Sequence, residues 1–182
     1  MQNVHMSILK MANPIQQYHW GSRQAIAEIQ GRPVPTDQPE AELWMGTHPK
    51  APSFVVRQVT EAGHSSNRTS LIDVLREQPD LIGKRAPELL PPGETEPGLP
   101  FLFKILAAEK ALSIQAHPDL ARAAAGFDRD EAAGIEASAA ERNYRDRNHK
   151  PELICALSDF YGMAGFRQIG RASCRERVSF TV

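Results

Sequence analysis

Proline and glycine interrupt the first third of this chain so often that only short elements fit between them. From residue 14 to residue 52 the interruptions are Pro14, Gly21, Gly31, Pro33, Pro35, Pro39, Gly46, Pro49 and Pro52. Proline removes a backbone hydrogen bond from a helix or sheet interior, and glycine is a poor helix former. We therefore expect short strands, short helices and turns in this region rather than long regular elements.

The rest of the chain alternates between apolar runs and breakers. The segment SLIDVLREQPD predicts a short helix, because its apolar residues share one helical face and Ser70 can cap its start. Phe101–Leu106 and Ala111–His117 predict two strands of a β-hairpin, and a third strand is expected from Glu152, just after a proline. The alanine-rich stretch over 121–144 is expected to be helical or partly loose, because two glycines interrupt it.

Composition excludes several classes of function. A chain of 182 residues with 41% hydrophobic residues can bury a core, and its formal net charge of −1 gives no reason to expect a nucleic acid or an anionic membrane as partner. Cys155 and Cys174 form neither a disulfide framework nor a thiolate zinc motif. Since the sequence has no export signal and no apolar run long enough to cross a bilayer, we expect a cytoplasmic protein.

The stretch SIQAHPD places three polar residues at alternate positions of a predicted strand. Ser113, Gln115 and His117 would then share one face, where buried polar groups need partners. An imidazole nitrogen from His117, an amide oxygen from Gln115 and a carboxylate from Glu152 would suit zinc or a similar divalent ion. From the residues alone, the spacing favours the alternative interpretation of a turn-capping histidine, a backbone-bonded glutamine and a surface glutamate.

Two lysines are further candidates for an internal polar site. Lys104 interrupts the apolar run FLFKIL, where an ammonium group needs a charged partner, a wet cavity or an edge position from which it can reach solvent. Lys150 precedes Glu152 closely in RNHKPE, so it is either near the site or a solvated loop residue.

Four segments together resemble the motifs of type I mannose-6-phosphate isomerase (phosphomannose isomerase). They are PIQQYHWGSR, AELWMGTHPKAPS, PFLFKILAAEKALSIQAHPD and AAERNYRDRNHKPEL, and the similarity extends from about Pro14 to Gln168. The resemblance implies a mainly β protein with a cupin-like, jelly-roll β-barrel and short helical segments. It also implies a zinc-dependent enzyme that interconverts mannose 6-phosphate and fructose 6-phosphate.

The resemblance also implies roles for individual residues. Gln115, His117 and Glu152 fall on metal-ligand positions of the family and would hold one zinc ion per chain. Lys104 and Ser113 fall on the wall of the sugar-phosphate pocket, and Lys150 is the candidate acid or base of the proton transfer. The expected partner is therefore a small sugar phosphate; the sequence does not indicate an oligomeric state.

Two departures from the family set further expectations. Family members are about twice as long and carry a fourth ligand, a histidine, and an arginine in their second half. We therefore expect residues 1–168 to be the N-terminal cupin-like catalytic domain, truncated before the helical and second cupin portions, and poorly active by itself. Residues 169–182 (IGRASCRERVSFTV) change character abruptly, and we expect a non-native tail that resembles translated adapter sequence. The alternative is a non-catalytic cupin-like module that binds a sugar or a metal.

Overall fold

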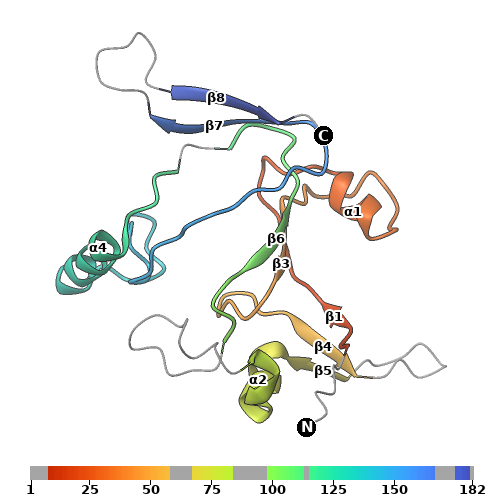
Figure 1. Cartoon of the computed structure of the whole chain (residues 1–182), viewed down its shortest axis with the longest axis horizontal. Helices are drawn as coiled ribbons and strands as arrows, with labels where there is room; N and C mark the ends of the chain where they lie inside the picture. The colour runs from red at the N-terminus through yellow and green to blue at the C-terminus, as the bar shows by residue number, and fades with distance from the viewer. Residues whose placement is uncertain (1–7, 58–66, 84–97, 113–114, 167–174, 181–182) are drawn as a thin grey trace. The chain divides into compact units, whose positions relative to one another are not determined.

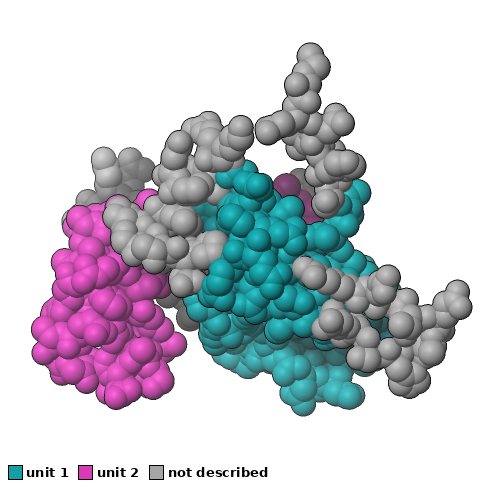
Figure 2. Space-filling view, turned by 90° about the horizontal axis from the view of Figure 1, so that it is seen from below, with its two compact units in different colours: residues 1–114 teal, residues 115–182 magenta. Residues whose placement is uncertain are grey.

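The structure is a computed structural model, and it describes residues 8–57, 67–83, 98–112, 115–166 and 175–180. The chain divides into two compact units, residues 1–114 and 115–182, which Figure 2 shows in teal and magenta. In the described part of the chain, strands outnumber helices, as expected from the sequence (Figure 1).

One sheet of the first unit packs against a helix. β1 (Met11–Ala12), β4 (Phe54–Arg57) and β5 (Asn67–Ser70) form this antiparallel sheet, and α2 (Leu71–Glu77) follows β5 directly, as Figure 1 shows. The predicted helix cap is confirmed, because the Ser70 hydroxyl accepts a hydrogen bond from the Ile72 N–H at 3.3 Å. Val55 of the sheet and Val74 of the helix, each 1% exposed, lie in the shared core. A 3₁₀ turn, Pro79–Ile82, ends this part.

The second sheet of the first unit carries one of the candidate residues. Its strand order is β2 (Ile15–Gln16), β3 (Glu42–Met45) and β6 (Phe103–Leu106), all antiparallel, and α1 (Ala25–Ile29) packs beside it. Ile26 of the helix and Leu43 of the central strand lie in the same core. The register places Lys104 opposite Trp44.

The predicted β-hairpin at 101–117 is wrong. β6 pairs with β3 instead, and residues 111–112 and 115–117 are not strand, while residues 113–114 lie outside the described part. The chain beyond β6 is held by earlier segments: the Ala107 N–H donates to the Ala41 carbonyl at 2.8 Å, and the Glu109 N–H donates to the Trp20 carbonyl at 2.9 Å. The chain therefore has other backbone partners at the point where a hairpin would turn back.

The second unit contains one long helix and a two-stranded ribbon. α4 (Leu120–Ala132) runs through Gly126 without a break and ends before Gly134, whose φ of 67° suits glycine. β7 (Phe160–Phe166) pairs with β8 (Arg175–Phe180) in antiparallel fashion. The strand expected from Glu152 therefore begins only at Phe160, and Leu153, which is 97% exposed, lies in a segment without regular structure. β8 lies within the segment expected to be a non-native tail.

The described strands form three separate sheets rather than one closed barrel. Closure of a barrel requires every strand to have two neighbours. Among the described residues, the outer strands of the two three-stranded sheets have only one neighbour each; these strands are β1, β5, β2 and β6. The mainly β character with short helical segments is confirmed, and α4 is the one long helix of the described part.

We expect the substitution Gly21→Ala to destabilise the first unit. A Cβ atom at this position would lie 2.6 Å from the Ala41 nitrogen and 2.7 Å from the Glu40 carbonyl carbon, so backbone rather than a flexible side chain would have to move. Such overpacking costs about 1–3 kcal/mol in the free energy of unfolding, measurable by urea denaturation. Gly31→Ala is the control, because nothing lies within 4 Å of a Cβ atom at that position. Its φ of 65° is unfavourable for alanine, and we expect this to lower the free energy of unfolding by about 1 kcal/mol. Equal losses in both variants would contradict this prediction.

Candidate metal centre

Two of the three candidate metal ligands lie together in the second unit. His117 stands just before Pro118 and Asp119, and the Asp119 carboxylate caps α4 by accepting a hydrogen bond from the Arg122 N–H at 2.8 Å. The Nδ1 atom of His117 lies 3.9 Å from Oε2 of Glu152, with side chains 31% and 51% exposed. An imidazole and a carboxylate from distant parts of the sequence thus face each other.

This pair fits a shared divalent cation. Two ligand atoms about 2.0–2.1 Å from a tetrahedral zinc ion are separated by roughly 3.3 Å, so a shift of about half an ångström would bring the pair to that spacing. Nitrogen and oxygen donors without thiolate suit zinc with an open position. Within the described ranges, no three His, Cys, Asp or Glu side chains converge as a metal site. Among the described residues, a third donor of another type is available in the Gln115 amide, which lies two residues before His117.

The strand argument that placed three candidates on one face is wrong for the residues that can be seen. Gln115 is exposed and, like His117, lies outside any strand, because this segment leads directly into the cap of α4. Ser113 lies outside the described residues. The proximity of His117 and Glu152 therefore comes from the path of the chain around α4 and not from alternation along a strand.

Lys150 opens onto the same cavity as His117. The cavity, of about 430 Å³, is lined by His117, Arg129, Tyr144, Arg145, Asp146 and Lys150 among others. The ammonium group of Lys150 donates to both carboxylate oxygens of Asp146, at 2.8 and 2.9 Å, and to the Asn148 carbonyl at 3.3 Å. Arg129 and Arg145 were not among the sequence candidates, although Arg145 belongs to the run ERNYRDRNHK, which contains several cations. A cavity with this lining suits an anionic polar ligand.

Lys104 lies in a polar cluster of the first unit. Its Nζ atom is 3.6 Å from Oε1 of Glu42 and 5.6 Å from the centre of the Trp44 ring, and its side chain is 31% exposed. The buried Glu42 carboxylate also accepts a hydrogen bond from Trp44 Nε1 at 2.7 Å. Burial, and next the Glu42 charge, raise the pKa of Tyr18 above its usual value. β6 is an edge strand of its described sheet, so Lys104 has both an edge position and a charged partner.

Comparison with known proteins gives the chain its family. The family model described as "Phosphomannose isomerase type I, catalytic domain" matches residues 8–169. The chain belongs to the type I phosphomannose isomerase family. Mannose-6-phosphate isomerase of Escherichia coli is 44% identical over 160 residues, which are 87% of this chain and 38% of that protein. The Saccharomyces cerevisiae enzyme of the same name is 39% identical, over 85% of this chain and 33% of that protein.

Solved structures agree with this family assignment. A zinc-bound mannose 6-phosphate isomerase matches with a TM-score of 0.72 and 43% identity, covering 88% of this chain and 38% of that one. The Salmonella typhimurium enzyme bound to fructose 6-phosphate and zinc matches with a TM-score of 0.71 and 42% identity. The cupin-like fold expected from the resemblance is thereby confirmed. The chain spans about 38% of the length of these phosphomannose isomerases.

None of the helices in the described ranges combines the length and the apolar character that a bilayer crossing requires.

Proposed function

We propose that this chain carries the zinc-binding and acid–base residues of a mannose-6-phosphate isomerase, an enzyme that interconverts mannose 6-phosphate and fructose 6-phosphate. The observation that carries the proposal is the 3.9 Å approach of His117 and Glu152 in a member of this family. Gln115, His117 and Glu152 would hold one zinc ion. The zinc-bound and fructose 6-phosphate-bound relatives support both the metal and the sugar phosphate.

Solved variants of the Salmonella typhimurium enzyme support the choice of residues. Its variants replace a lysine, a histidine and a glutamate. In that protein the lysine precedes the histidine, and the glutamate follows it, by the same numbers of residues as Lys104 precedes and Glu152 follows His117 here. A shared spacing of three residue types supports equivalent positions for Lys104, His117 and Glu152.

The chemistry assigns distinct tasks to these residues. Interconversion of an aldose and a ketose moves one proton between C1 and C2 of the sugar, so a group must accept it from one carbon and return it to the other. Lys150, which opens onto the His117 cavity, would accept that proton as a neutral amine and return it from the resulting ammonium. Lys104 and Ser113 would bind the substrate. A bound zinc ion supplies a Lewis acid that stabilises negative charge on the sugar oxygens.

We further propose that residues 1–168 form the family's catalytic segment and that 169–182 lie outside it. The match to the family model, which covers residues 8–169, supports a boundary within one residue of this position. Three nitrogen and oxygen donors with exposed side chains would bind zinc weakly. We therefore expect the 182-residue chain by itself to turn over mannose 6-phosphate at roughly one-thousandth of the rate of its Escherichia coli relative, or less.

The test of the proposed function is a chimaera in which residues 8–169 replace the matching segment of the Escherichia coli relative. We expect it to interconvert mannose 6-phosphate and fructose 6-phosphate, to lose this turnover when a chelator removes the metal, and to regain it with zinc. A folded, zinc-loaded chimaera without turnover would contradict the proposal and favour a module that binds sugar or metal without catalysis. Turnover that survives removal of the metal would contradict the assigned role of zinc.

A further inference from the structure

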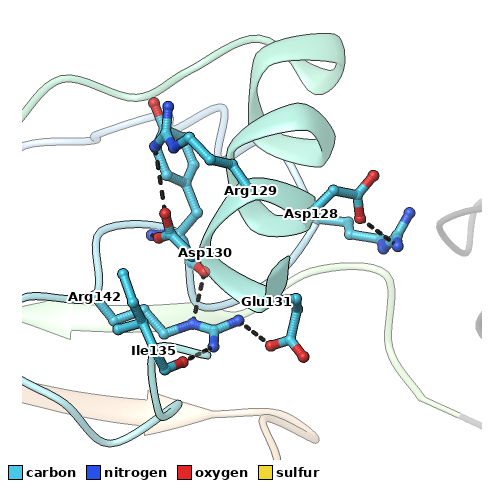
Figure 3. A network of polar contacts seen from close by, with 8 residues as sticks. Asp128, Arg129, Asp130, Glu131, Ile135 and Arg142 are labelled. Atoms are coloured by element: carbon cyan, nitrogen blue, oxygen red, sulfur yellow. Dashed lines mark hydrogen bonds and ion pairs between the residues drawn. The ribbon is translucent and has the colours of Figure 1, made fainter. Parts of the chain in front are cut away.

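We propose that Asp130 and Arg142 are positioning residues of the metal centre. They tie the segment 142–144 to α4, and through it they set the distance between Glu152 and His117. This inference rests on the proposed function, because it assigns a task to residues that touch neither metal nor sugar. Figure 3 shows the network of polar contacts that carries it.

Arg142 is almost completely enclosed, with 2% of its side chain exposed. Its Nε atom donates to the Tyr144 carbonyl at 3.0 Å, Nη1 donates to the Ile135 carbonyl at 2.5 Å, and Nη2 donates to Oε1 of Glu131 at 2.5 Å (Figure 3). The guanidinium carbon also lies 4.9 Å from the centre of the Phe127 ring. One side chain thus links the end of α4, the loop that follows it and the returning segment.

Asp130 holds the same segment from the helix side. Its carboxylate, in a residue 4% exposed, accepts a hydrogen bond from the Tyr144 N–H at 3.1 Å and one from Arg129 Nη2 at 3.3 Å. The pKa of Asp130 lies below its ordinary value. The main cause is the hydrogen bond from the Tyr144 N–H, followed by the interactions with Arg129 and Arg142. Both backbone polar groups of Tyr144, its N–H and its carbonyl, are therefore bound by buried charged side chains.

The Tyr144 ring is fitted to the helix surface as well. A Cβ atom at Gly126 would lie 2.5–2.6 Å from three atoms of this ring, so the glycine in the middle of α4 makes room for it. The Arg129 guanidinium lies 5.4 Å from the centre of the ring. Tyr144 is thus fixed by two backbone hydrogen bonds and by direct contact with α4.

The two ends of this network lead to the two candidate ligands. His117 stands two residues before Asp119, which caps the first turn of α4, while Asp130 lies near the helix end. On the returning side, Asp146 lies two residues after Tyr144, and its carboxylate accepts hydrogen bonds from the Asn148 N–H at 2.9 Å and from the Lys150 ammonium group. Lys150 in turn lies two residues before Glu152. Movement of Tyr144 along α4 would therefore change the His117–Glu152 separation.

Buried charge is an expensive way to hold a segment in place. A well-packed apolar group of similar size is often as stable or more stable, so we infer that the buried charges of Asp130 and Arg142 fix one defined geometry rather than add stability. Ligand-orienting contacts around metal sites change metal affinity about 10- to 100-fold when they are removed. An apolar replacement in this network should therefore weaken metal binding even where the chain remains folded.

The first experiment measures zinc affinity of the 182-residue chain by competition with a chelator. We expect Arg142→Met to weaken zinc binding roughly 10- to 100-fold. The zinc affinity of Arg142→Lys should lie between those of the native chain and Arg142→Met, because lysine lacks the planar fork of donors that arginine has. The matched control is Arg147→Met: Arg147 lies 5.3 Å from the same Phe127 ring, but its side chain is 59% exposed. Unchanged affinity in a folded Arg142→Met chain would overturn the positioning role.

The second experiment uses the unaltered network, so it decides the matter even if Arg142→Met does not fold. Coupling is reciprocal: if the network sets the metal site, zinc must stabilise the network. We expect zinc to slow hydrogen exchange at the Tyr144 N–H in the native chain and to have no such effect in His117→Ala. Exchange at Tyr144 that zinc leaves unchanged, in a chain that binds zinc through His117, would overturn the inference.

The two proposals fail in different ways. If His117→Ala binds zinc as tightly as the native chain, the proposed metal site is wrong and the positioning role is wrong with it. If His117→Ala loses zinc while Arg142→Met keeps it, only the positioning role is wrong.

Discussion

Replacing His117 by alanine is expected to remove both the zinc ion and the isomerase turnover of the chimaera. The substitution deletes the imidazole that faces Glu152 at 3.9 Å and leaves oxygen donors alone to hold the metal. Loss of a Lewis acid forfeits several kcal/mol of transition-state stabilisation, so turnover should fall roughly a thousandfold or more. Metal content and the rate of mannose 6-phosphate conversion are measured on the same preparation.

His149→Ala is the matched control for this prediction. His149 is an exposed histidine in the same unit, three residues before Glu152. We expect it to retain zinc and to keep turnover within about twofold, because His149 is not among the residues that line the cavity with His117. A loss of zinc in His149→Ala comparable to that in His117→Ala would mean that the imidazole ligand has been misassigned.

Replacing Lys150 by methionine is expected to lower kcat while leaving zinc bound. Methionine keeps a chain of similar length but cannot exchange a proton, and loss of a general acid or base costs roughly a hundredfold or more. The ion pair with Asp146 also disappears; at this exposed position its effect on stability is within about 1 kcal/mol. The measurement is kcat and KM for mannose 6-phosphate together with metal content.

Lys110→Met is the control for Lys150→Met, because Lys110 is also exposed and is not one of the residues of the proposed site. Its kcat should equal that of the unaltered chimaera. A Lys150→Met chimaera with unchanged kcat and a raised KM would contradict a proton-transfer role and indicate that Lys150 binds the substrate instead.

Local patterns predicted some elements correctly because the interactions that form them are local. α2 begins where Ser70 caps it, and its buried face is the one that the spacing of Leu71, Val74 and Leu75 predicts. The hairpin prediction failed because alternation within 101–117 cannot show that β6 has a distant partner strand, β3. Strand pairing over long sequence separations depends on tertiary contacts that a single segment does not contain.

The candidate site, too, was predicted from the sequence only in part. His117 and Glu152 were named from their chemistry, and the structure brings them together, but by the path of the chain around α4 rather than by the expected strand. Asp130 and Arg142 went unnoticed because they stand among many charged residues that are typical of a solvated surface. Only their burial, produced by Tyr144 and the end of α4, sets them apart.

We propose that this chain holds zinc through an imidazole and oxygen donors. X-ray absorption at the zinc edge of the zinc-loaded 182-residue chain decides whether it does. We expect one zinc ion per chain with nitrogen and oxygen neighbours at about 2.0–2.1 Å and the scattering pattern of a single imidazole, which His117→Ala removes. Sulfur neighbours at about 2.3 Å, or imidazole scattering that survives in His117→Ala, would contradict the claim.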